Sequence, residues 1–568
     1  MIPVQPSTPS SRGPAFVRGL SLAADVVCAP FILGLAGAVF TWGYDGLAYG
    51  LGLGAGIVLL QLLIAPILPQ MPAGSVPELF AVRFGGSAPR AAAALAVVVS
   101  MTTLLVAMLM AGGLVTERFL GFDACTAILV ASATLVAVHL LRRVFASAWL
   151  RAIVFVGILL ALLAPTVLLS ADWYGLPVPQ IAYGNALPQI QALEETLLEQ
   201  ELADPSVMKP MLTAFVSLDP LNFLGLILGV ALGLAVLPSV LAGHFMGGSA
   251  RAARWSAVWA LLFATLLLTL MPALAAYAKL AVLKLIAAPT PLAQLPDWIF
   301  TYGRLGLVQI CGVPAIDAAS VGQACAALPD ATTVLRLHNL ALSPDMITLA
   351  APEITGLGSP LLGIVAAAVL AAFLVTAEAP LAAIVTAVCG ETRPRSGLVA
   401  CAVVASAVAA AAYVASTHPA SILEVATWAL MLAASALFPA LVIGLWWPRA
   451  SATAATVAVL AGLAVSLHYL LAARYLAPGF YETWETLSSA GPTAREFYSE
   501  LKTAWVEAAP GPARDAAWAA LDAHAQGIAN WWGVERFAGV LLALPVGALA
   551  MVLLSLVLPS RHAPETAS

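Results

Sequence analysis

Long apolar segments recur along the chain, each bounded by short stretches rich in Gly, Pro and charged residues. A helix needs about 20 apolar residues to cross a bilayer, and segments of about this length occur throughout the 568 residues. The pattern predicts about twelve membrane-spanning helices, at residues 20–42, 46–68, 90–116, 124–141, 147–170, 221–245, 252–281, 360–388, 397–417, 420–446, 452–473 and 536–558.

The first predicted span is interrupted by Asp25 and Pro30. Proline lacks an N–H and clashes with the preceding turn, so it breaks or kinks a helix. Carbonyls freed inside a membrane are tolerated where they line a cavity for an ion or a solute. The sixth span has interruptions at Gly229, Gly233 and Pro238. Matched breaks predict two inverted repeats around a midplane site; two ordinary Pro-kinked helices are the alternative.

Composition changes this picture little. The chain is 62% hydrophobic and 9% charged, whereas a soluble domain carries about 25% charged residues. It is therefore an integral membrane protein, and its long segments favour a helical bundle over a β-barrel. Net charge is −5 without a basic patch, so nucleic acid is not an expected partner. No nucleotide loop, HExxH or nucleophile elbow is present, which argues against a pump or an enzyme and implies no cofactor.

Arginines in short loops predict the orientation. Cytoplasmic loops carry an excess of Lys and Arg. With both termini in the cytoplasm of a bacterial-type inner membrane, the short inner loops hold Arg83, Arg90, Arg142, Arg143, Arg251, Arg254, Arg393, Arg395 and Arg449.

The expected organisation has five parts. They are a tail (1–19), a first repeat of five spans (20–170), an outer loop with an acidic amphipathic helix (171–219), a second repeat (220–446) with an outer loop (289–359), and two accessory spans (447–568) with an outer loop (474–535). Cys311 and Cys325 share one outer loop. A disulfide is possible if that loop faces an oxidising compartment; two unpaired thiols fit the spacing equally well.

Three ionisable residues lie inside predicted spans, where such groups are costly and usually functional. Asp25 has the alternative role of an N-cap for the first span. Arg151 could instead extend to the cytoplasmic headgroups. Glu378 lies near the middle of its span, two residues after Thr376. Freed carbonyls together with a hydroxyl form a hard-oxygen environment that suits an alkali cation.

Several segments resemble the sodium:solute symporter family, and within it the cation/acetate symporter-like branch. The resemblance covers residues 17–446 and is carried by SLAADVVCAPFILGLAG, LIAPILPQMPAGSVPELFAVRFGG, DPLNFLGLILGVALGLAVLP, TLAAPEITGLGSP and AAFLVTAEAPLAAIVTAV. It implies a leucine-transporter-type fold, with two inverted five-helix repeats plus flanking helices. It also implies symport of a small organic solute, such as acetate or another short monocarboxylate, with sodium or a proton.

The resemblance also implies a cation site. Carbonyls of Ala24 and Val27 would face Ala372, Val375 and Thr376 across the bundle. The chain departs from the family pattern at two positions. Where the family usually has two adjacent residues with hydroxyl groups, this chain has Val375 and Thr376, and Arg151 replaces an uncharged polar or acidic residue. One hypothesis is that the Arg151 guanidinium occupies or neutralises the ion site, leaving Glu378 or Asp25 to carry a proton.

The solute is expected between the two broken spans. Candidate lining residues are Asp25, Cys28, Ala29 and Pro30 at the first break, and Gly233 to Pro238 at the sixth. Helix N-termini exposed at such breaks favour an anionic headgroup. The alternative function is that of a transporter-like sensor or partner subunit, which binds solute without coupled transport.

Overall fold

The computed structural model describes residues 14–141, 147–205, 208–245, 250–328, 332–390 and 397–558. Among these residues, ten helical segments are long and apolar enough to cross a membrane, and the apolar helix α6 (Ala124–Leu140) is shorter. The predicted all-helical membrane fold is therefore confirmed. Four arginines used to orient the chain lie outside the described residues: Arg142, Arg143, Arg393 and Arg395.

Three membrane helices are interrupted inside the bundle. The first consists of α1 (Ala15–Val26) and α2 (Ala29–Trp42). The second consists of α11 (Pro220–Ala235) and α12 (Pro238–Leu241), and the third of α17 (Ser359–Thr376) and α18 (Glu378–Cys389). The breaks predicted at Pro30 and Pro238 are therefore present, and the third was not predicted. Helix α1 begins five residues before the expected start of the first span.

A proline explains each interruption. Pro30, Pro238 and Pro380 follow directly after the three breaks. Each lacks the N–H that would bond to the carbonyl four residues earlier, which belongs to Val26, Leu234 or Thr376. The chain therefore loses helical hydrogen bonds at three places inside the bundle, and the freed oxygens need other partners.

The remaining helices complete the bundle and its loops. Their bounds are α3 (Leu47–Leu59), α4 (Val76–Phe84), α5 (Ser87–Leu120), α8 (Ala148–Tyr174), α9 (Pro179–Ala182), α10 (Ala186–Glu199), α13 (Ala250–Ala287), α14 (Asp297–Gly303), α15 (Ala318–Ala326), α16 (Pro344–Ile354), α19 (Gly397–Ser416), α20 (Ile422–Trp446), α21 (Ala452–Tyr475), α22 (Ala477–Trp484), α23 (Pro492–Glu507), α24 (Pro512–Ile528) and α25 (Val540–Val557). Gly43, with φ +58°, ends α2 and turns the chain toward α3.

The interrupted helices lie at the centre of the bundle. Helix α1 packs against α8 and α13, and α8 also packs against α17. Helix α12 contacts both α1 and α18, while α20 packs against α5, α11 and α21. Most of the buried apolar side chains belong to one continuous core. The three breaks are therefore brought into one buried region.

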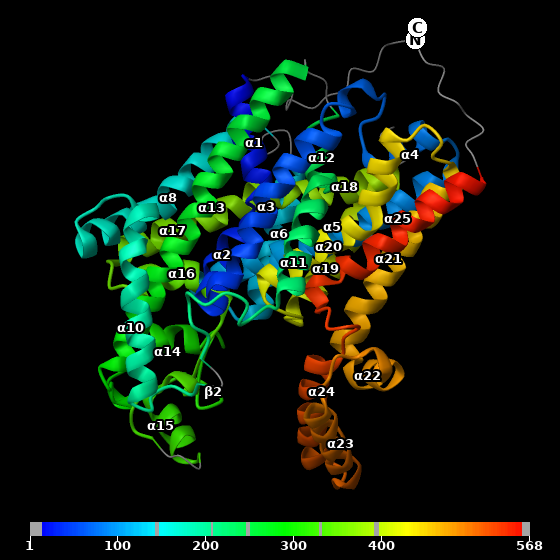
Figure 1. Ribbon diagram of the computed structural model, residues 1–568. Coiled ribbons are helices and arrows are strands. Elements are labelled where there is room, and N and C mark those ends of the chain that lie inside the picture. The colour runs from blue at the N-terminus through cyan, green and yellow to red at the C-terminus, as the bar shows by residue number, and fades with distance from the viewer. Residues whose placement is uncertain are drawn as a thin grey trace.

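The long loops gather at one end of the bundle, opposite the start of α1 and the end of α25 (Figure 1). One group contains α10, α14, α15 and an antiparallel sheet of order β2-β1-β3, formed by β1 (Val308–Ile310), β2 (Val313–Pro314) and β3 (Leu340–Leu342). A second group, α22 to α24, projects from the bundle. Cys311 and Cys325 form a disulfide within the first group.

The acidic helix predicted in the first outer loop is α10. Glu194 on this helix is buried, and its carboxylate lies 3.4 Å from the ammonium of Lys279 on α13. Its burial raises the pKa of Glu194, which the nearby Lys279 opposes. This carboxylate therefore ties α10 to the bundle instead of facing water.

Replacing Gly233 by Ala is expected to destabilise the bundle. A Cβ at this position would lie 2.2 Å from the carbonyl oxygen of Leu430 on α20, and such overpacking costs about 1–3 kcal/mol. Gly50→Ala on α3 is the matched control, because a Cβ there meets no atom within 4 Å. Thermal unfolding in detergent should give a lower Tm for Gly233→Ala only; equal Tm values would contradict the close helix contact.

Candidate functional site

The break between α1 and α2 exposes backbone oxygens inside the bundle. Val27 and Cys28 leave the helical conformation, with ψ angles of 63° and 173°. Within the described part of the chain, no backbone N–H donates to the carbonyls of Ala24 or Val27. Both residues are about 1% exposed, so water does not reach them readily. These two oxygens are the ones that the family resemblance assigns to a cation.

Thr376, at the end of α17, adds further oxygen atoms. Its hydroxyl donates to the carbonyl of Ala372 at 2.7 Å, and no donor among the described residues bonds to the hydroxyl oxygen. Pro380 deprives the Thr376 carbonyl of its helical partner. Ala372, Val375 and Thr376 are all buried, and α17 contacts both α1 and α2.

The chemistry of these donors fits an alkali cation. Carbonyl and hydroxyl oxygens are hard ligands, and no thiolate or imidazole is assigned to the set. Val375 contributes no side-chain oxygen, so the backbone would supply most of the ligands.

Arg151 and Asp25 form a buried ion pair between α8 and α1. Nη1 of Arg151 lies 2.9 Å from Oδ2 and 3.1 Å from Oδ1 of Asp25, and each side chain is 13% exposed. Asp25 is in the last turn of α1, so the N-cap alternative is wrong. Arg151 binds this carboxylate, so the headgroup alternative is also wrong. The guanidinium next to the proposed ion site is therefore already balanced by a negative charge.

Glu378 has a partner that sequence reasoning missed. Nδ1 of His139, near the end of α6, lies 3.5 Å from Oε1 of Glu378, and their side chains are 11% and 6% exposed. The only sequence signal was a histidine within an apolar segment. Glu378 is the first residue of α18, so the break of the third interrupted helix lies beside this acidic group.

The second broken helix contributes small and polar groups. Pro238 and Ser239 start α12 and are buried, with Ser239 supplying a hydroxyl that sequence reasoning did not single out. Gly233 lies where the backbone of α20 approaches α11. Cys28, Ala29 and Pro30 are equally buried at the first break. Since α12 contacts α1, the two breaks are neighbours in space.

Helix α16 packs against α2 beside this region. The Thr348 hydroxyl donates to the carbonyls of Ile32 and Leu33 on α2, at 3.0 and 2.8 Å. Asp345 accepts the backbone N–H of Ile422 at the start of α20, 3.0 Å from each carboxylate oxygen. Helix α16 is therefore joined to both α2 and α20.

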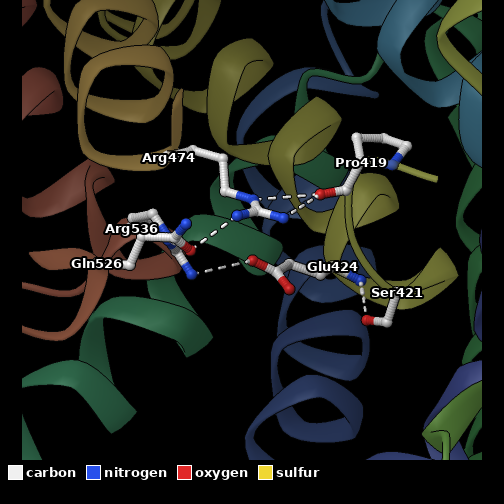
Figure 2. Close-up of polar contacts among 6 residues, drawn as sticks. All are labelled: Pro419, Ser421, Glu424, Arg474, Gln526 and Arg536. Carbon is white, nitrogen blue, oxygen red and sulfur yellow. Dashed lines mark hydrogen bonds and ion pairs between the residues drawn. The ribbon is translucent and has the colours of Figure 1, made fainter. Parts of the chain in front are cut away.

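A network of polar side chains also contacts the N-terminal end of α20, where Asp345 binds (Figure 2). Arg474 donates to the carbonyl of Pro419 and, at 2.7 Å, to Oε1 of Gln526 on α24. Arg536 donates to the same amide oxygen at 3.3 Å and lies 3.9 Å from Glu424. Gln526 thus links the projecting helices to the N-terminal end of α20.

Comparisons with known proteins agree with this architecture. The family model described as "Sodium:solute symporter family" matches residues 12–302, about half of the chain. An uncharacterized symporter of Cupriavidus necator is 28% identical, over 81% of this chain and 80% of that protein. An uncharacterized symporter of Bacillus subtilis is 26% identical over 24% of this chain and 26% of its own length.

The solved structure of a Na+-coupled sialic acid symporter, in a substrate-bound outward-open state, shares the fold. The alignment covers 97% of this chain and 91% of that chain, with a TM-score of 0.55 and 12% identity. At this identity the likeness concerns the fold alone. It supports the leucine-transporter-type architecture expected from the sequence.

Removing one charge of the buried Asp25–Arg151 ion pair should destabilise the protein more than removing both charges. Asp25→Asn leaves a buried guanidinium unpaired, and Arg151→Gln leaves a buried carboxylate unpaired; such changes cost about 3–5 kcal/mol. The double variant leaves neither charge. Thermal unfolding in detergent should therefore give a higher Tm for the double variant than for either single one. A double variant less stable than both would contradict the pairing.

Asp345 should make stability depend on pH. Burial raises the pKa of its carboxyl from 3.8 to about 7, with Glu424 adding to the shift and the Ile422 N–H opposing it. The folded protein then keeps a proton that the unfolded chain releases, so stability falls as pH rises from about 4 to 7, by up to about 1.4 kcal/mol per pH unit.

Asp345→Asn removes this dependence while keeping an oxygen for the Ile422 N–H. The Tm of Asp345→Asn relative to the unmodified protein should rise across that pH window. Asp317→Asn is a contrasting control, because hydrogen bonds from Ser320 lower the pKa of Asp317, and its relative Tm should rise toward acid. A pH-independent difference for Asp345→Asn would contradict the burial argument.

Proposed function

Because this chain belongs to the sodium:solute symporter family, we propose that it is a secondary active transporter that moves a small organic solute across a membrane by symport with sodium or a proton. It is a multi-pass membrane protein and a transporter, not an enzyme. The solute that we propose is a short monocarboxylate such as acetate. No resident cofactor is invoked, and the coupling ion is itself cargo.

One observation carries the proposal: backbone oxygens without partners lie at the break in the first helix. Carbonyls of Ala24 and Val27 have no backbone donor among the described residues, and α1 contacts the helix that carries Thr376. Leaving such groups unsatisfied inside a membrane costs several kcal/mol each. A bound cation would remove this cost, which supports a coupling site here.

The broken helices also support an anionic solute. Helices α2 and α12 both begin at breaks inside the bundle, and the partial positive charge at a helix N-terminus favours a carboxylate. Ala29, Pro30 and Pro238 are small or apolar, so the region suits a short apolar tail. Asp25 is engaged by Arg151, and its charge is therefore balanced rather than directed at the solute.

A second function is favoured by Val375 and Arg151. Val375 lacks the hydroxyl that the family pattern supplies, and a fixed guanidinium lies next to the proposed ion site. A protein that kept the fold but lost ion coupling would be a sensor or partner subunit. It would bind solute saturably without accumulating it.

The disulfide supports an orientation. Disulfides persist in oxidising compartments and are rare in the cytosol, and Cys311–Cys325 lies in the loop group opposite the start of α1 and the end of α25 (Figure 1). We therefore place these loops outside the cell and both termini in the cytoplasm. A bacterial-type inner membrane is the proposed location.

Uptake of labelled acetate into proteoliposomes, under an imposed sodium gradient and separately under an imposed proton gradient, tests the proposal. We expect accumulation under at least one gradient. Saturable binding without accumulation under either would favour the sensor, and neither binding nor accumulation would reject acetate as the solute.

Thr376→Val should weaken any sodium dependence of that uptake. The change removes the hydroxyl oxygen and preserves side-chain shape, so the sodium concentration for half-maximal uptake should rise about tenfold or more, as expected for loss of about 1.4 kcal/mol of ion binding. Thr386→Val in α18 is the matched control, because its hydroxyl also donates to the carbonyl four residues earlier at 2.7 Å. Equal sodium dependence in the two variants would contradict the assigned site.

A further inference from the structure

A cavity of about 320 Å³ lies where the first loop group meets the membrane helices. Its lining comes from the end of α2, from α10 and the loop after it, from α13, and from strand β3 with the residues before it. All of the lining residues differ from those of the candidate site described above. Phe40 lies ten residues after Pro30, which is about 15 Å along the axis of α2. The cavity is therefore a separate place for a ligand.

The size and the lining of the cavity suit a small organic molecule. Ligand sites in proteins usually have volumes of about 300–1,000 Å³ and are lined mainly by apolar side chains with a few polar groups. Here the apolar lining includes Phe40, Val282, Leu283, Leu340 and Leu342. A water molecule takes about 30 Å³ of liquid volume, so a molecule as small as acetate would leave much of the space unfilled. The volume therefore favours a ligand with a tail of several carbons.

The polar groups of the lining have unused hydrogen-bond donors. The buried hydroxyl of Thr41 has no partner among the described residues. The ammonium of Lys279 has three N–H donors; one bonds to the carbonyl of Lys209 at 3.1 Å, and another serves Glu194 at 3.4 Å. The exposed ammonium of Lys209 forms no ion pair within the described part of the chain. An occupant of the cavity should therefore bring acceptor oxygens.

The two carboxylates of the lining already have partners. Glu194 accepts the backbone N–H of Met211 at 3.2 and 3.4 Å and lies beside Lys279. Asp204 takes part in an interaction of its own and is exposed to solvent. A carboxylate of a ligand could accept from the donors that remain, and its bonds to an ammonium would be stronger than bonds between neutral groups.

We propose that this cavity is a second ligand-binding site, which takes a carboxylate with an apolar tail longer than that of acetate. Thr41, Lys209 and Lys279 would supply the donors for the acid group, and the apolar side chains of the lining would enclose the tail. Such a ligand would contact α2, α13 and β3 together. Its binding would therefore hold the end of α2 against the first loop group. The proposal concerns binding alone and holds whichever solute is transported.

The test measures thermal unfolding of the purified protein in detergent at neutral pH, with increasing sodium hexanoate and with total sodium kept constant by sodium chloride. A ligand that binds only the folded protein raises its Tm as the ligand concentration increases. Hexanamide is the matched control ligand, because it has the same length and no charge. We expect an apparent Kd at least tenfold lower for hexanoate than for hexanamide.

Thr41→Val and Lys209→Gln each remove one of the proposed donors. Neither side chain has a polar partner among the described residues, so both variants should fold. Each should raise the Kd for hexanoate severalfold, and the double variant should raise it about tenfold. Thr103→Val and Lys502→Gln are matched controls, because these two residues lie outside the cavity lining. Both controls should bind hexanoate like the unmodified protein.

A Tm that does not rise with hexanoate would overturn the proposed site, and equal Kd values for hexanoate and hexanamide would overturn its preference for a carboxylate. An unchanged Kd in the double variant would place the binding elsewhere and would also overturn the site. Gel filtration reports whether each variant folds, and the single variants decide the question if the double variant does not. The measurement uses neither transport nor acetate, so failure of the proposed function would appear only in the uptake assay.

Discussion

The central region depends on one constraint: polar backbone groups inside a membrane must find partners. An uninterrupted helix meets this constraint by itself, whereas α1–α2, α11–α12 and α17–α18 do not, because a proline follows each break. Neighbouring side chains supply hydrogen-bond partners for some of these backbone groups. The Thr348 hydroxyl binds two carbonyls of α2. Among the described residues, no backbone N–H donates to the carbonyls of Ala24 and Val27, so these oxygens are where chemistry can take place.

Two breaks could be predicted because their prolines interrupt apolar segments at matching positions in the chain. The third, at Pro380, was not predicted, because proline alone does not decide the outcome. Pro165, Pro272, Pro439 and Pro545 all lie inside helices that continue past them. Whether a helix breaks depends on what its neighbours supply to the freed groups, and packing between distant segments determines that.

The charged groups show a similar limit. The positions of Asp25, Arg151 and Glu378 in apolar segments suggested burial, with other roles left open for Asp25 and Arg151, but did not identify their partners. Glu378 pairs with His139, 239 residues earlier, and Asp25 with Arg151, 126 residues later. Local patterns predict the cost of burying a charge, whereas only the tertiary fold determines which opposite charge offsets it. Glu194 shows the same limit, since it lies in a locally acidic helix and the fold buries it against Lys279.

The projecting helices α22 to α24 have a small core of their own, formed with the end of α21 by residues such as Phe480, Tyr498, Leu521 and Ile528. This core is separate from the one that holds the transport helices. The outward surface of α22 to α24 can therefore be redesigned with little disturbance to the bundle. For electron cryomicroscopy, where a belt of detergent hides most of such a protein, an antibody fragment raised against this protrusion would provide a landmark for aligning particle images.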